Sequence, residues 1–190
     1  MTPSARNVLW ITGLALLMLI TRGELLSSIV PMQLHDASWA AFLLAGAVLR
    51  KPMYLLMLAL LAVGLDFGAL CAGSFAVGQC LKPSYPVLMG SWVLLWAAGR
   101  MLTTSQLKSP VIGRNLLIVA GAGTAAYLLT SGAFYLWSGL YDGWTLGQYT
   151  TMSSAYFLMA LGTTVGYTAA GLVICALQGS SAASNTRQAV

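Results

Sequence analysis

Long apolar runs alternate with short polar segments along most of the chain. A helix needs about 20 mostly apolar residues to cross the hydrocarbon core of a membrane. Six such helices are predicted, at Val8–Ile20 with an apolar extension to Val30, Ala37–Leu49, Met53–Ala72, Tyr85–Leu102, Asn115–Trp137 and Thr150–Leu177. We therefore expect an all-α transmembrane bundle forming a single domain over residues 1–177. The Ser-, Ala- and Gln-rich residues 178–190 are expected to form a disordered tail.

Two of the apolar runs allow a second interpretation. Arg6 precedes the first run, as in a secretory signal peptide, but no cleavage site of small residues follows it, so we expect a retained helix. The run at Ala37–Leu49 is short for a membrane span. It either begins earlier or lies beside a pocket.

Composition supports a membrane location. Of the 190 residues, 58% are hydrophobic and 7% are charged, whereas a soluble domain has roughly 25% charged residues. A surface so poor in charge cannot face water, so we expect it to face the lipid bilayer, which is the partner of this surface. The net charge of +5 raises the question of nucleic acid, but the chain has no basic cluster and no alternation of aromatic and basic residues. We therefore expect no nucleic-acid partner.

The basic residues predict the orientation, because cytoplasmic loops of membrane proteins collect Lys and Arg. With the N-terminus inside, only Arg22 and Lys82 fall in outer segments. The inner segments then hold the other seven, namely Arg6, Arg50, Lys51, Arg100, Lys108, Arg114 and Arg187. Both termini are therefore expected in the cytoplasm.

Most other polar and aromatic loop residues then gather at the outer face. They are Glu24, His35, Asp36, Cys80, Tyr85, Asp142, Trp144 and Tyr149, with Lys82 among them. Polar chemistry on one face is typical of a receptor or carrier for a molecule that arrives from outside.

Asp66 is the only acid inside a predicted helix. Counted from Met53 at 1.5 Å per residue, it lies about 20 Å from the inner face, in the outer third of the membrane. An intramembrane carboxylate is energetically costly and by default indicates a functional site. The alternative is a structural hydrogen bond to a neighbouring helix.

Cys80 differs from the other two cysteines. Cys71 and Cys175 fall in apolar helical surroundings and are expected to be small buried side chains. Cys80 is expected in a loop two residues before Lys82, whose charge favours the thiolate. It is a metal ligand, a disulfide partner of Cys71, or an inert exposed thiol. The absence of any C-x-x-C argues against the usual dithiol redox motif.

Other outer residues also have alternative interpretations. His35 and Asp36 adjoin the start of a predicted helix, and Asp36 or Ser38 could serve as its N-cap. Tyr85, Trp144 and Tyr149 are either aromatic residues at headgroup depth, which are common, or a platform for a large flat ligand.

The stretch from Leu65 to Tyr85, L-D-F-G-A-L-C-A-G-S-F-A-V-G-Q-C-L-K-P-S-Y, resembles the BtuM-type cobalamin transporters. The likeness rests on the cysteine after the third helix, and the size and number of spans agree over the whole chain. These transporters are similar to the substrate-binding S-components of energy-coupling-factor transporters.

The resemblance implies uptake of cobalamin (vitamin B12) across the bacterial inner membrane. It makes Cys80 the ligand of the corrinoid cobalt and the residue that removes cyanide from cyanocobalamin. A thiolate is a soft donor suited to a transition metal. Asp66, Tyr85, His35, Lys82, Trp144 and Tyr149 would bind the corrinoid, and no other cofactor is implied. The first helix lacks the A-x-x-x-A docking pattern of coupled S-components, so partnership with an energising module stays open.

Two other functions remain as alternatives. One is an S-component for another vitamin that works with an energising complex. The other is a membrane thiol oxidoreductase, which would require a second reactive cysteine besides Cys80.

Overall fold

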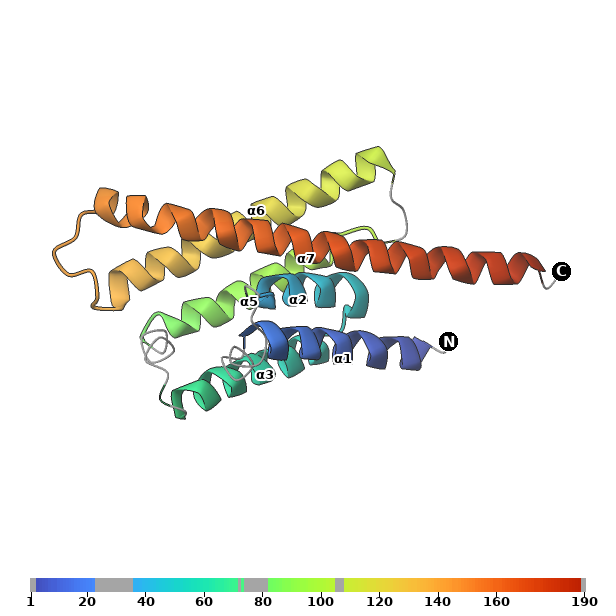
Figure 1. Ribbon diagram of the computed structural model, residues 1–190, viewed down its shortest axis with the longest axis horizontal. Coiled ribbons are helices and arrows are strands. Elements are labelled where there is room, and N and C mark those ends of the chain that lie inside the picture. The colour runs from blue at the N-terminus through green and yellow to red at the C-terminus, as the bar shows by residue number, and fades with distance from the viewer. Residues whose placement is uncertain (1–2, 23–35, 72, 74–81, 105–107, 189–190) are drawn as a thin grey trace.

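The computed structural model describes residues 3–22, 36–71, 73, 82–104 and 108–188, with side chains up to residue 178. These residues form helices joined by short connections, and no strand occurs among them (Figure 1). The helices are α1 (Pro3–Arg22), α2 (Ser38–Leu44), which continues into the π-helical turns η2 (Ala45–Leu49), α3 (Pro52–Cys71), α5 (Tyr85–Gly99), α6 (Ser109–Trp137) and α7 (Leu146–Gln188).

The described helices are suited to a membrane. Four are long and apolar enough to cross one, at Ser4–Arg22, Pro52–Cys71, Ser109–Trp137 and Leu146–Gln178. Their outward surfaces carry large exposed apolar side chains such as Leu60, Leu117 and Leu158. A soluble protein would not present so many of these to water. The chain is therefore an all-helical, multi-pass membrane protein.

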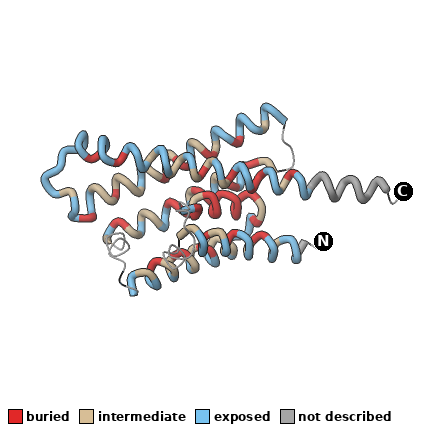
Figure 2. Tube along the Cα trace, viewed as in Figure 1, coloured by how far each residue is buried: buried red, intermediate tan, exposed pale blue. Residues whose placement is uncertain are grey.

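Two shorter apolar helices, Ser38–Leu49 and Tyr85–Gly99, form the middle of the bundle (Figure 1). Helix α2 contacts α1, α5 and α7, and α6 packs against both α5 and α7. Almost every residue of α2 and η2 is buried (Figure 2). A helix that is apolar on all sides is stable here because protein, rather than lipid, surrounds it.

Glycines allow α2, η2 and α5 to approach at backbone distance. A Cβ atom at Gly99 would lie 2.0 Å from the carbonyl oxygen of Leu43, and one at Gly46 would lie 2.0 Å from that of Trp96. Neither backbone atom can rotate away. The two short helices are therefore joined at two points where only glycine fits.

We predict that Gly99→Ala separates these helices and destabilises the protein by about 1–3 kcal/mol or more, the usual cost of overpacking. Thermal unfolding in detergent measures the change. Gly90→Ala on the same helix is the matched control, because no atom lies within 4 Å of the added Cβ. Equal midpoints for the two variants would contradict the tight crossing.

Helices α6 and α7 both begin earlier than the sequence predicted. The region around Pro110 and Arg114 was expected to be a polar loop, but α6 begins at Ser109, since proline fits the first turn of a helix. Helix α7 begins at Leu146 rather than at Thr150. Gln148 Oε1 accepts a hydrogen bond from the Thr145 N–H (2.8 Å), and Thr145 Oγ1 accepts one from the Gln148 N–H (3.3 Å). This reciprocal pair is a capping box.

The end of the chain also differs from the prediction. Helix α7 continues to Gln188, through residues 178–188, for which a disordered tail was expected. This segment contains no proline and a single glycine, and its alanine and glutamine residues favour helix. Nothing in its sequence stops the helix that precedes it.

Candidate functional site

Arg22, the last residue of α1, is the centre of a cluster of charged and polar side chains. Its Nε and Nη2 donate to the two carboxylate oxygens of Asp66 on α3, at 2.8 and 2.7 Å. Its Nη1 donates to Asp36 Oδ2 (3.1 Å) and to Ser38 Oγ (3.0 Å) at the start of α2. The paired arrangement with Asp66 is the strongest geometry available to an arginine and a carboxylate.

The cluster lies against aromatic rings of the core. The Arg22 guanidinium lies 5.6 Å from the centre of the Trp92 ring on α5, and Phe42 stacks on the same ring at 5.2 Å. Tyr85, the first residue of α5, donates its hydroxyl to Asp66 Oδ2 at 2.7 Å. The face of an indole ring attracts a cation placed over it. The single guanidinium group of Arg22 therefore connects α1, α2, α3 and α5.

Asp36 extends this cluster toward open space. Its Oδ1 accepts hydrogen bonds from the backbone N–H and the hydroxyl of Ser38, at 2.9 and 2.5 Å. The N-cap residue of α2 is Ala37 rather than Asp36 or Ser38, and the Asp36 carboxylate instead accepts the N–H of Ser38, the first residue of the helix. Unlike Asp66, whose side chain is 11% exposed, that of Asp36 is 46% exposed.

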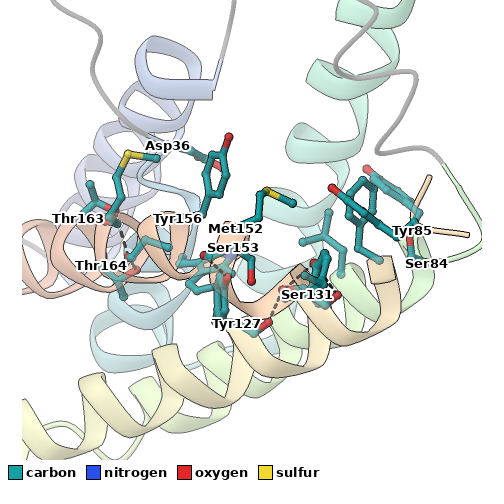
Figure 3. A pocket seen from close by; sticks show the side chains of 18 residues that line it. Asp36, Ser84, Tyr85, Tyr127, Ser131, Met152, Ser153, Tyr156, Thr163 and Thr164 are labelled. Carbon is teal, nitrogen blue, oxygen red and sulfur yellow. Dashed lines mark hydrogen bonds between the residues drawn. The ribbon is translucent and has the colours of Figure 1, made fainter. Parts of the chain in front are cut away.

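A cavity of about 730 Å³ opens beside this carboxylate. Its wall comes from the starts of α2 and α5, from α6 and α7, and from the connection between the last two helices (Figure 3). Its volume lies within the usual range for small-molecule sites. Helix α2 begins beside the cavity at Ser38, and the first turn of α5, with Tyr85 and Leu88, forms part of its wall.

The wall combines rings with hydroxyl groups. Tyr127 donates its hydroxyl to the Ser153 carbonyl at 2.6 Å (Figure 3). The hydroxyl groups of Tyr149 and Ser131 share a hydrogen bond at 2.8 Å. Tyr156 and Met159 add apolar surface further along α7. Such a wall can hold a large, mostly apolar ligand and hydrogen-bond its polar edge.

Aromatic rings gather where α6 and α7 connect. The rings of Tyr135 and Tyr149 lie 4.9 Å apart, and those of Tyr141 and Tyr149 lie 4.8 Å apart. Trp144 reaches Tyr141 at 5.5 Å. Burial raises the pKa of Tyr141, with the neighbouring Tyr156 as a second cause, so this phenol stays neutral at physiological pH.

The structure brings together some of the residues that the sequence singled out. Tyr85 and Tyr149 line the cavity, and Asp66 lies behind Tyr85, to which it is hydrogen-bonded. Trp144 is exposed and reaches the wall only through Tyr141. Lys82 is partly exposed and does not line the cavity; its carbonyl accepts the Tyr85 N–H.

Cys80 and His35 lie outside the residues that the structure describes. Cys175 is partly buried, and the expectation of a buried Cys71 is wrong, because this thiol is exposed at the end of α3. Lipid accepts a thiol as readily as a protein core does. Among the described residues, no group of three or more His, Cys, Asp and Glu side chains could hold a metal ion.

Sequence reasoning missed Arg22 as a partner of Asp66, because it counted this arginine only as an outer loop charge. It also missed the hydroxyl-rich face of α7, formed by Tyr149, Ser153, Tyr156, Ala160, Thr163 and Thr164. Their spacing of three or four residues is the period of one helix face, which was a signal available in the sequence.

Comparison of the chain with models of protein families and with curated proteins finds no match. The function must therefore be inferred from the site itself.

We predict that Asp66→Asn destabilises the protein by roughly 2–3 kcal/mol, since it leaves the Arg22 guanidinium without its paired carboxylate. The midpoint of thermal unfolding should fall accordingly. Asp142→Asn, in the exposed connection before α7, is the control and should leave the midpoint unchanged. An Asp66→Asn protein as stable as the control would mean that the ion pair adds nothing to the fold.

Proposed function

We propose that this protein is an inner-membrane cobalamin transporter that binds the corrinoid in the cavity at its outer face, with Cys80 as the cobalt ligand. The observation that carries the proposal is the cavity of about 730 Å³, whose wall includes Ser84 and Tyr85, four and five residues after Cys80 in the chain. Its aromatic rings suit the flat corrin, and its hydroxyl groups suit the amides at the corrin edge.

The proposed chemistry is an exchange of cobalt ligands. The Cys80 thiolate donates an electron pair to cobalt, and cyanide leaves cyanocobalamin with the pair that bound it. A soft sulfur donor suits this metal. A thiol oxidoreductase would need a second reactive cysteine. Cys175 is partly buried and lies near the far end of α7, about 40 Å along that helix from the cavity-lining Tyr149, so Cys71, which is exposed at the end of α3, is the thiol that this alternative would use.

The proposal includes six spans, with both termini in the cytoplasm. In this arrangement the short helices α2 and α5 cross together with the four longer ones. Trp10 Nε1 donates to Gln178 Oε1 at 3.3 Å, so the beginning of α1 and the inner half of α7 lie side by side. Both ends of the described chain also point the same way in Figure 1. An even number of spans accounts for this.

Topology can be tested by labelling single cysteines in a chain whose native cysteines are replaced by serine. Positions next to Lys51 and Lys108 should react only after the membrane is made permeable, and those next to Lys82 and Asp142 should react from the periplasm. The basis is the excess of basic residues in inner loops. Reaction of the Lys108 position from the periplasm would rule out this orientation.

Cobalt ligation can be tested with Cys80→Ser. This change replaces a soft donor by a hard, largely protonated one, so the spectral change of cyanocobalamin on binding should disappear and cyanide should stay bound. Affinity should fall less, because the cavity wall still holds the corrin. The measurements are the visible absorption spectrum and the release of cyanide.

Cys71→Ser is the matched control, since this thiol lies in the same region of the chain, at the end of α3. It should keep the wild-type spectrum. A wild-type spectral shift in Cys80→Ser would show that cobalt ligation by Cys80 is wrong. Binding of a different vitamin, together with no binding of cobalamin, would favour the alternative S-component function.

A further inference from the structure

The side chains at the α2 end of the cavity carry an unbalanced negative charge. Arg22 contributes one positive charge, whereas Asp36 and Asp66 contribute two negative charges. Asp66 takes two hydrogen bonds from the guanidinium and Asp36 takes one, at the longer distance of 3.1 Å. The excess charge therefore lies mainly on Asp36, the member of the cluster that lines the cavity.

Within the part of the cavity wall that the structure describes, no positive charge offsets it. Among the described residues that line the cavity, Asp36 is the only ionisable acid, and none is lysine, arginine or histidine. The others are apolar, aromatic or hydroxyl-bearing, and they come from α2, α5, α6, α7 and the connection between α6 and α7. A ligand carboxylate would enter this space without a cationic partner, at a cost that low polarity increases.

Asp36 also has hydrogen-bonding capacity to spare. A carboxylate offers about four acceptor positions, and the structure uses three: two on Oδ1 by Ser38 and one on Oδ2 by Arg22. Because these contacts fix the carboxylate at the wall, Oδ2 is held ready to accept one further N–H from a ligand in the cavity.

We propose that Asp36 is a specificity-determining residue, which accepts a hydrogen bond from an uncharged amide of the ligand and rejects a carboxylate in the same place. Arg22 is its positioning residue. The inference rests on the proposed function and restricts the range of corrinoids that the cavity would bind. The cavity would take corrinoids whose edge groups are amides and would discriminate against those in which a critical amide has been hydrolysed.

The test compares cyanocobalamin with the three monocarboxylic acids that mild acid hydrolysis forms from its propionamide side chains. Each differs from the parent by one amide replaced by one carboxylate. At least one of them should bind the wild-type protein about tenfold more weakly or worse, since two like charges in contact repel by more than the equivalent free energy. Isothermal titration in detergent gives the affinities.

Asp36→Asn removes the negative charge and keeps an oxygen for the Ser38 N–H. In this variant, the affinity for that monocarboxylic acid should be within about threefold of the affinity for cyanocobalamin. Most of the tenfold difference seen with the wild-type protein would then be lost. If this variant does not fold, Asp36→Ser serves instead, because its hydroxyl also accepts from the Ser38 N–H. Asp142→Asn removes an exposed acid outside the cavity and should keep the wild-type discrimination.

A purely structural role of Asp36 would lower the affinities for all the corrinoids together and leave their ratios unchanged. Unchanged ratios in the folded variant would overturn the inference, as would equal binding of all four corrinoids by the wild-type protein, while the proposed function would stand. No binding of cyanocobalamin by the wild-type protein would overturn the proposed function itself, and this inference with it.

Discussion

The ion pair between Arg22 and Asp66 is the contact on which the arrangement of α1, α2, α3 and α5 depends. Neither charge could remain alone among these apolar helices, since an ionised side chain away from water costs several kcal/mol unless it is paired. Each therefore requires the other, and α1 must end beside the last turns of α3. The Nη1 group of Arg22 then donates to Asp36 and Ser38 at the start of α2, and the guanidinium lies over the Trp92 ring of α5. Four helices are positioned by one side chain.

The cavity follows from the shortness of the central helix α2. Helix α2 with η2 joins α5 at Gly46 and Gly99, and Asp36 and Tyr85 lie at the starts of these two helices. Helices α5, α6 and α7 all extend beyond the start of α2 (Figure 1). Their side chains, together with those at the start of α2, form the wall of the cavity.

Much of the fold could be predicted from the sequence because hydrophobic length is a strong signal. The predicted helices correspond to those of the structure within a few residues at most ends, and Asp66 was recognised from its cost in an apolar helix. The ends that were wrong depend on local chemistry that a hydropathy pattern does not contain: Pro110 in a first helical turn, and the capping pair of Thr145 and Gln148.

The site was harder to predict than the fold. Tyr85 and Tyr149 were chosen from their place in the topology, but the ion pair of Arg22 with Asp66 joins residues 44 positions apart, and no spacing rule connects them. In three dimensions the two acids are not equivalent. Asp66, which the sequence singled out, is neutralised by Arg22, whereas Asp36, which was interpreted as a helix cap, lines the cavity.

The glycine crossing between the central helices also restricts how the protein can move. Where two backbones touch without side chains between them, sliding by even one residue would bring a Cβ atom of a neighbouring position against a carbonyl oxygen. We therefore expect α2 with η2 and α5 to move together. A change in the width of the cavity would then involve α6 and α7, whose tyrosines form the rest of its wall, while Asp36 and Tyr85 keep their relative positions.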